Sequence, residues 1–224
     1  MDNVHFEYMD FEPDVDLFKE EIHFDILEDE AVEQVEYLIS YAREHLKPSF
    51  GGIYLTVDDY KDLAEGASVT FGGKTLEGLP VAKLKGACHV APYYVTCGTQ
   101  LEDMDASSMD FMAPFWIDVL KRQSLFFARK KAFDYYREVL GSKVISSINP
   151  GSGNVGYWPV DHLKPLFELF DEYGCRTDVS LSPNMYMMPN KSVCGIFYAS
   201  EKEIYTCSEC RRQNCPSRRA PFAG

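Results

Sequence analysis

The chain has 224 residues, 46% hydrophobic and 14% aromatic, so it can bury one sizeable core and is too apolar for a disordered polymer. Its net charge of −13 is concentrated in residues 1–36, where fourteen acidic residues face the single base Lys19. This acidic N-terminal arm argues against a nucleic-acid partner, because phosphate binding requires a basic face. It favours instead a solvated edge, or docking on a basic partner surface or on the arginine-rich tail.

The cellular setting follows from what the sequence lacks. No apolar run reaches the roughly 18–20 residues that span a bilayer, so we expect no membrane association. The first residues, MDNVHFEYMDFEP, carry neither the basic nor the apolar segment of a secretory signal. Seven cysteines is an odd number, and a disulfide framework is unusual in a chain this long. We therefore expect a cytoplasmic protein with reduced thiols.

The first third of the chain is predicted to contain strands around one helix. Apolar residues alternate with polar ones from Val4 to Tyr8 and again from Ile22 to Ile26, which predicts two half-buried strands. Asp29 can cap a helix whose apolar positions recur at helical spacing until Lys47-Pro48. Residues 53–57 are predicted to form the next strand.

The middle third is dominated by one long predicted helix. Residues 65–80 are rich in glycine and indicate a turn or hairpin, and residues 87–96 predict a strand entering a Cys97-Gly98 turn. Ser107 or Ser108 can open a helix that runs to Gly141. We expect its aromatic stripe to pack in the core; the stripe consists of Phe111, Phe115, Phe126, Phe127, Phe133 and Tyr136.

The last third mixes short elements. A strand is predicted at 144–148, followed by the loop NPGSGNVGYWP (149–159), a helix at about 161–173, and strands near 176–181 and 192–199. Because strands and helices do not alternate regularly, the class predicted is α+β. We expect one domain over 1–206, followed by a Cys- and Arg-rich tail over 207–224.

The tail contains the strongest chemical signal. Cys207, Cys210 and Cys215 have the spacing C-x2-C-x4-C and are followed by Pro216. Such thiols suit a metal centre, either zinc or an iron–sulfur cluster, and each of these requires four ligands. The fourth must come from elsewhere in the chain, from another cysteine or one of the five histidines.

The glycine-rich loop 149–159 is a weaker signal. It offers free backbone N–H groups and room for close approach to a ligand. It matches neither a dinucleotide fingerprint nor a P-loop with its lysine, so nucleotide binding through those motifs is not expected. No nucleophile elbow accompanies Ser147 or Ser152.

Four short stretches, in order, resemble the activation domain of cobalamin-dependent methionine synthase and the stand-alone proteins similar to it. They are ILEDEAV (26–32), VTCGTQLE (95–102), PGSG (150–153) and MMPNKSVCGIFY (187–198). The resemblance extends from about Asp10 to Tyr205. It implies an α+β fold around a bent, mainly antiparallel sheet with flanking helices. It also implies a role in returning inactive cob(II)alamin to service by one-electron reduction, trapped by methyl transfer from S-adenosylmethionine.

The resemblance also implies a methyl-donor site. Asp10 matches the family's binding aspartate, Pro150 and Gly151 match the Pro-Gly pair of R-P-x-P-G-Y, and Tyr205 matches a late tyrosine. The arginine of that motif is Ser147 here, and losing a charge-assisted grip on the methionine carboxylate costs about 1.5–3 kcal/mol, so we expect weakened binding. The full set of expected cofactor-binding residues is Asp10, Asn149, Pro150, Gly151, Ser152, Gly153 and Tyr205.

Three functions follow as hypotheses. The first is an accessory redox protein that passes an electron from an iron–sulfur cluster, held by Cys207, Cys210, Cys215 and Cys97, to cobalamin on a separate corrinoid protein or methyltransferase. The second is an S-adenosylmethionine-binding activation subunit whose tail holds structural zinc. The third is a binding module that recognises the corrinoid partner without redox chemistry. No D-x-H-x-x-G run is present, so we expect the cobalamin to arrive on the partner.

Overall fold

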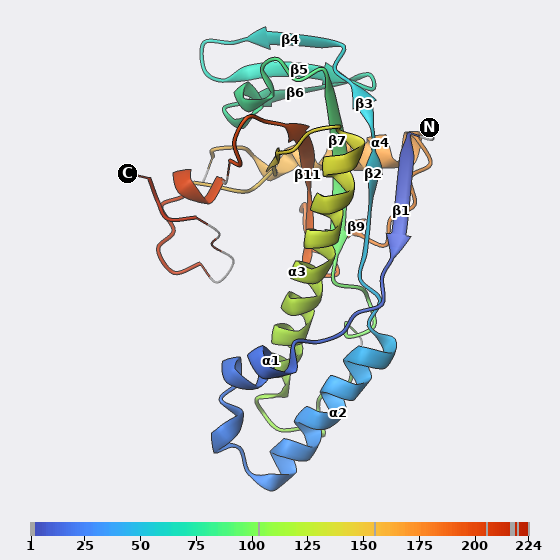
Figure 1. The fold of residues 1–224 in the computed structure, drawn as a ribbon, viewed down its shortest axis with the longest axis vertical. Coiled ribbons are helices and arrows are strands. Elements are labelled where there is room, and N and C mark those ends of the chain that lie inside the picture. Colours follow the sequence, from blue (N-terminus) through green and yellow to red (C-terminus); the bar gives the residue numbers. More distant parts are fainter. Residues whose placement is uncertain are drawn as a thin grey trace.

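The architecture is taken from a computed structural model, which describes residues 3–102, 104–154, 156–204, 206–215, 218 and 220–223. Its centre is an antiparallel sheet with the strand order β1-β2-β7-β11-β8, and a short strand β3 also pairs with β7 (Figure 1). The bounds are β1 Val4–Tyr8, β2 Ser49–Ile53, β3 Leu55–Thr56, β7 His89–Thr96, β8 Ile145–Ile148 and β11 Ser192–Ala199.

Two smaller sheets accompany the central one. A three-stranded antiparallel sheet at the top of Figure 1 consists of β4 (Asp59–Asp62), β5 (Ala67–Phe71) and β6 (Lys74–Gly78). The turn between β5 and β6 contains Gly72 and Gly73, both at positive φ. A two-residue pair joins β9 (Ser180–Leu181) to β10 (Met187–Met188).

One long helix connects the two ends of the molecule. Helix α3 (Ala113–Val139) packs on the central sheet with its C-terminal half and against α1 (Val15–Glu21) and α2 (Asp29–His45) with its N-terminal half (Figure 1). Helix α4 (Leu163–Glu172) follows the 149–159 loop. Short 3₁₀ turns complete the chain: η1 Phe24–Ile26, η2 Pro80–Leu84, η3 Val160–His162 and η4 Thr206–Glu209. In the described part of the chain, no helix combines the length and apolar character needed to cross a membrane.

The central sheet buries both of its faces because neighbouring residues of a strand point in opposite directions. On β7, Tyr93 lies in the core shared with α3, whereas Tyr94 lies in the core shared with α4 and the β4–β6 sheet. A third core joins α1, α2 and the start of α3 around Trp116. The α+β class with a mainly antiparallel sheet is thus confirmed.

Several sequence predictions need correction. Residues 22–26 do not form a strand: the chain runs from α1 into η1, and Ile26 is 76% exposed. The long helix begins at Ala113 rather than at Ser107 or Ser108. Its aromatic residues do not all pack in the core, because Phe111, Phe115 and Phe126 are 87%, 44% and 42% exposed.

Residues 3–36 are a folded part of the domain rather than a projecting arm. Strand β1 is hydrogen-bonded to β2, and Phe11, Phe18 and Ile22 are buried against α2 and α3. The acidic residues of this segment therefore lie on a defined surface. Two predicted strands are longer than the observed ones. Residues 53–57 divide between β2 and β3, and only Ser180–Leu181 forms a strand within 176–181.

Candidate functional site: the C-terminal tail on the 149–159 loop

The 149–159 loop is fixed to the sheet by the buried amide of Asn149. Its Nδ2 donates to the Tyr93 hydroxyl at 2.8 Å and to the Cys194 carbonyl at 2.9 Å, and its Oδ1 accepts from Ser147 Oγ at 3.2 Å. All three bonds lie among buried residues, where an unmade hydrogen bond costs about 1–3 kcal/mol. Asn149 is therefore a structural anchor that sets where the loop begins.

The loop then folds back on itself. Ser152 N donates to the Asn149 carbonyl at 3.1 Å, and Gly151 N donates to the Trp158 carbonyl at 2.9 Å. Gly151 has φ 76°, and a Cβ there would lie 2.7 Å from Val160 Cγ1, so the position requires glycine. The turn leaves Gly153 and Asn154 facing the C-terminal tail.

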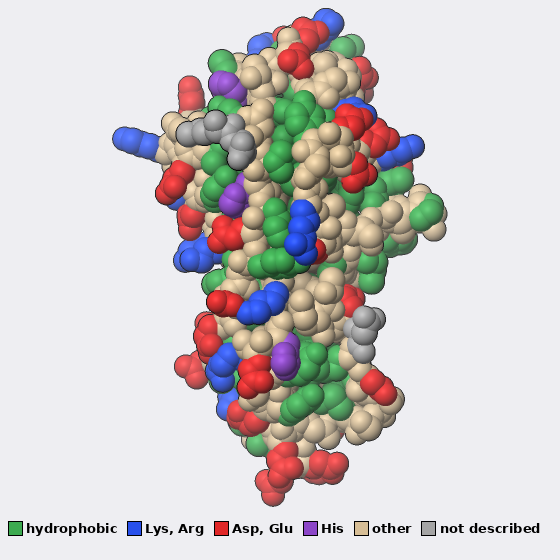
Figure 2. Space-filling model, turned by 90° about the vertical axis from the view of Figure 1, so that its right-hand side faces the viewer, with side chains coloured by type: hydrophobic (Ala, Val, Ile, Leu, Met, Phe, Trp, Pro, Cys, Tyr) green, Lys and Arg blue, Asp and Glu red, His purple; other side chains and the backbone are tan. Residues whose placement is uncertain are grey.

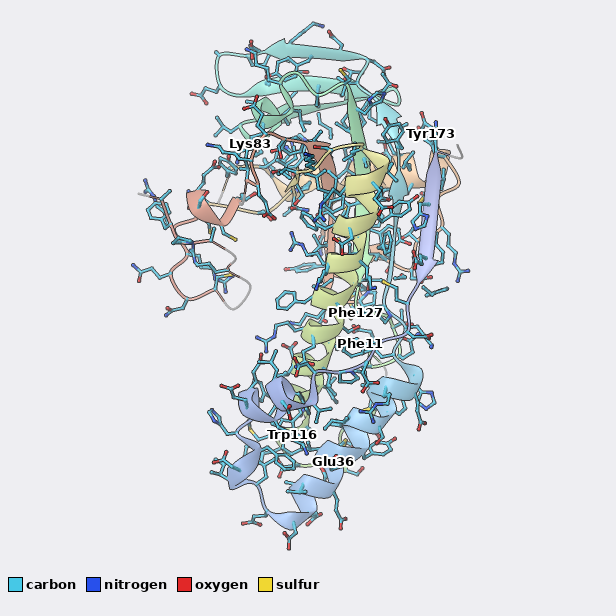
Figure 3. All side chains as sticks on the ribbon, viewed as in Figure 1. Phe11, Glu36, Lys83, Trp116, Phe127 and Tyr173 are labelled. Carbon is cyan, nitrogen blue, oxygen red and sulfur yellow. The ribbon has the colours of Figure 1, made fainter. Side chains whose placement is uncertain are left out.

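The tail docks on this loop through Glu209. The Glu209 carboxylate accepts from Lys83 Nζ at 2.9 Å and from the Tyr157 hydroxyl. Asn154 Nδ2 donates to the Glu209 carbonyl at 2.9 Å, and Asn154 Oδ1 accepts from Arg211 N at 2.9 Å. Figure 3 labels Lys83 close to the segment that leads into the tail. Two separate parts of the chain, η2 and the loop, thus hold the tail.

Cys207 and Cys210 lie on the docked segment. Cys210 N donates to the Cys207 carbonyl at 3.2 Å, which places both thiols on one turn, and Cys210 Sγ is 3.6 Å from the Gly153 carbonyl. The Arg218 guanidinium donates to the carbonyls of Cys207 at 2.8 Å and Cys210 at 2.9 Å. All three tail cysteines are free and partly exposed. Arg218 therefore fixes the backbone of the two leading thiols.

The described residues do not yet form a closed metal site. Within them, no group of three or more His, Cys, Asp or Glu side chains is gathered around one point. The donor chemistry nevertheless fits a thiolate-bound centre, because three free cysteines lie within one short, solvent-accessible segment.

Of the remaining cysteines, Cys97 lies apart from the tail. It is fully buried next to α3, directly after the end of β7 that pairs with Ser192, and its thiol donates to the Gly98 carbonyl at 3.2 Å. The tail follows the opposite end of β11, which lies seven residues from Ser192 along the strand, or roughly 24 Å. Burial raises the pKa of Cys97 to about 12.

Cys88 is better placed for the tail. Burial raises the pKa of Cys175 to about 11 and that of Cys194 further, whereas Cys88 is exposed. Cys88 lines a hollow of about 740 Å³ that shares Lys83 and Lys202 with the hollow under Glu209. Among the described cysteines outside the tail, Cys88 is thus the accessible one.

No hydrogen bond or ion pair among the described residues joins Asp10 to the 149–159 loop. Asp10 follows β1 and Pro150 follows β8, and these strands are the two edges of the central sheet. Four strand spacings of about 4.8 Å separate the edges, or roughly 19 Å. The Asp10 carboxylate is 97% exposed and pairs with Lys47, which lowers its pKa through a hydrogen bond and its charge. Tyr205 lies outside the described residues.

The residues that dock the tail were not found from the sequence. Lys83 and Glu209 are 126 positions apart, and neither belongs to a recognisable motif. Tyr157 and Asn154 fall in the glycine-rich loop, so the loop itself was the available signal, but it was interpreted as a ligand cradle. Arg218 was noted only for its charge.

Comparisons with known proteins bear on the fold. No family model matches the chain, and no curated protein matches it. Among solved structures, the crystal structure of the MetH reactivation domain bound to AdoHcy superposes with a TM-score of 0.63, at 12% sequence identity, covering 90% of this chain and 80% of that one.

The chain has the MetH reactivation-domain fold. The family resemblance inferred from four short sequence stretches is thus confirmed at the level of the fold. At 12% identity, the comparison shows that the two proteins share an architecture. The bound AdoHcy is a feature of the MetH structure.

The docking of the tail should depend on the charge of Glu209. Burial of this carboxylate opposes its ionisation, but hydrogen bonds from Tyr157 and Lys83 and the Lys83 charge outweigh it and lower the pKa. A lowered pKa in the folded state stabilises docking above the ordinary pKa, near 4.5, and this contribution is lost as the pH falls through the folded-state pKa. We expect Glu209→Gln to increase amide hydrogen exchange of residues 206–211 about threefold to tenfold at pH 7.

Wild-type protein should show the same loss of protection in acid, after correction for intrinsic exchange rates. The matched control is Glu203→Gln, an exposed carboxylate three residues before η4. Equal protection in wild type and Glu209→Gln would contradict the role of this carboxylate.

Proposed function

We propose that this protein reduces cob(II)alamin carried by a separate corrinoid protein, using an iron–sulfur cluster held by Cys207, Cys210 and Cys215. The observation that carries the proposal is the docking of a three-thiol tail on the 149–159 loop of a reactivation-domain fold. The loop corresponds to the segment that the family resemblance associates with the methyl donor. A redox centre in the tail would therefore lie beside the surface that meets the corrinoid.

The electron count is simple. Cys207, Cys210 and Cys215 would hold a cluster that would supply one electron, converting cob(II)alamin to cob(I)alamin. An external low-potential reductant, such as a ferredoxin or flavoprotein, would then reduce the cluster again. A methyl donor then traps cob(I)alamin as the methylated form. The chain's own residues position the centre: Glu209, Lys83 and Tyr157 anchor the tail, and Arg218 holds the backbone of Cys207 and Cys210.

The fourth ligand in this proposal is Cys88. Its exposure and its position in the hollow adjoining the tail support it. Cys97, the ligand expected from the sequence, has its thiol buried next to α3 and a raised pKa. Binding of Cys97 to the tail would require opening the core, whereas the Cys88 thiol is already exposed.

An alternative function keeps the same fold and partner class. In it, the protein binds S-adenosylmethionine and the tail holds structural zinc. The AdoHcy in the MetH reactivation domain favours this alternative. The buried serine at the arginine position, Ser147, and the separation of Asp10 from the loop argue against a tight site.

The test uses full-length protein reconstituted without air with iron and sulfide, then reduced and freed of excess reductant. We expect it to reduce cob(II)inamide, with added methyl iodide trapping up to one methylcobinamide per electron delivered. Protein treated identically without iron is the control. Reduction that does not depend on iron, or none at all, would overturn the redox proposal. Micromolar S-adenosylmethionine binding by a zinc-loaded, iron-free protein would establish the alternative.

A further inference from the structure

A groove runs along the acidic end of the molecule, far from the tail. Two adjoining hollows of about 720 Å³ and about 620 Å³ lie between the N-terminal part of α2 and residues 104–112. They share Glu30, Gln34, Ser108 and Met109, so they form one depression, which we name the tip groove. From Glu30 to Tyr41 it follows α2 for about 17 Å, or about three helical turns.

The tip groove has an apolar part that the fold leaves open. Phe111 is 87% exposed, Ile26 76% and Met112 36%, and all three line it. Isolated exposed apolar residues are ordinary, but large ones gathered in one depression indicate an interaction site. The sequence pattern predicts burial for two of them, Phe111 in the aromatic stripe and Ile26 in a half-buried strand.

The rim of the tip groove is acidic, and no neighbouring lysine or arginine among the described lining residues balances its charge. None of the described residues lining the groove is a lysine or arginine, and the sequence has none from 20 to 42 or from 98 to 120. Figure 2 shows acidic side chains gathered at this lower end. Nearby Glu36 is paired with Lys19, and Glu21 with Arg122. Glu28, Glu30 and Glu33, by contrast, have no ion pair with any described residue.

The groove also contains an unused hydrogen-bond donor. Trp116, labelled in Figure 3, is fully buried yet contributes to the groove lining, and its Nε1–H has no acceptor among the described residues. Buried indole N–H groups usually have a partner, because an unmade bond there costs about 1–3 kcal/mol. Because the Trp116 side chain is 0% exposed, this donor lies behind the groove lining, and the docking argument rests on the apolar and acidic residues.

We infer that the tip groove docks an amphipathic helix bearing lysine or arginine, supplied by a protein partner. Its apolar face would cover Phe111, Ile26 and Met112, and its basic residues would reach Glu28, Glu30 and Glu33. The groove is about three helical turns long, enough for the anchors at i, i+3, i+4 and i+7 of a helix-in-groove contact. This surface does not depend on the tail chemistry and holds whether or not the tail binds metal.

The test measures binding of a fluorescently labelled helical peptide of leucines and lysines, with the lysines on one face, to the full-length protein. The same peptide with glutamate for every lysine is the probe control. We expect Glu30→Lys/Glu33→Lys to weaken binding at least tenfold at low salt, because it reverses the rim charge. The matched variant Glu65→Lys/Glu138→Lys makes the same net-charge change at exposed sites elsewhere and should weaken binding less than threefold.

Phe111→Ser tests the apolar contact and should weaken binding even at high salt, where charge is screened. Equal weakening by both double variants would overturn the proposal, since the attraction would then be general. Equal binding of the glutamate peptide would do the same. So would a protein dimer in sedimentation that Phe111→Ser dissociates, because the groove would then hold a second copy.

Discussion

Removing any one of the thiols of Cys207, Cys210 or Cys215 should abolish iron uptake. A cubane cluster requires four thiolates, and three of them come from this segment, so two remaining tail ligands cannot hold the centre. We expect reconstituted wild type to bind about four iron atoms per chain, with broad visible absorption, and each Cys→Ala variant to bind less than a tenth of that. Iron and sulfide content and the visible spectrum measure the effect.

Two further variants identify the fourth ligand. We expect Cys88→Ala to lose most of the iron and Cys97→Ala to retain it, because the thiol of Cys88 is accessible and that of Cys97 is buried with its pKa raised to about 12. The reverse result would make Cys97 the ligand. Circular dichroism must show that each variant is folded. A colourless wild type containing one zinc would replace the cluster with the structural-zinc alternative.

Strong periodicity gave reliable predictions in this chain. Strand β11 has the predicted bounds 192–199, β1 covers the predicted Val4 to Tyr8, and α2 follows the predicted helical pattern. In β1 and α2 the apolar residues repeat with the period of the element, whereas β11 is a short, almost continuous apolar run, typical of a strand buried on both faces. Ile22, Phe24 and Ile26 alternate over the same length as Val4, Phe6 and Tyr8, so the pattern alone does not separate the two stretches. Residues 4–8 pair with β2, whereas residues 22–26 continue directly from α1 into η1, so tertiary context decided the outcome.

The prediction that the whole aromatic stripe packs in the core was wrong for a different reason. Large apolar residues at helical spacing predict burial only where another element covers that face. Helix α3 outruns the sheet, and at its N-terminal end Phe115 is left partly uncovered, with Phe111 just before the helix. The sequence pattern does not reveal how far a neighbouring sheet extends, so exposed aromatic residues at the tip were beyond its reach.

The site was predicted only in part. The cysteine spacing marked the tail, and the glycines marked the loop, but their contact was not foreseeable. It depends on Lys83 and Glu209, which topology brings together across 126 positions. Single charged residues are common on surfaces, so pairing over such a distance leaves no trace in one sequence.

Gly195→Ala should produce the largest loss of stability. Gly195 lies on β11, and a Cβ there would be 2.2 Å from Asn149 Nδ2 and 2.4 Å from the Ile148 carbonyl oxygen. The carbonyl belongs to the paired strand β8 and cannot move without opening the ladder between Ile196 and Ile148. We expect the free energy of unfolding to fall by at least about 3 kcal/mol, which would lower the Tm by about 6–12 °C.

Two companion variants separate the causes of that loss. At Gly73, φ is 76° and an added Cβ would meet nothing within 4 Å. Gly73→Ala should therefore lower the free energy of unfolding by only about 1 kcal/mol, the cost of placing alanine in the left-handed region. Asn149→Ala removes one of the two colliding groups, so the double variant Gly195→Ala/Asn149→Ala should be more stable than the sum of the single effects predicts. If Gly195→Ala melts like wild type, β8 does not pair with β11 as described. The loop, and the tail docked on it, would then lose the anchor on which the candidate site depends.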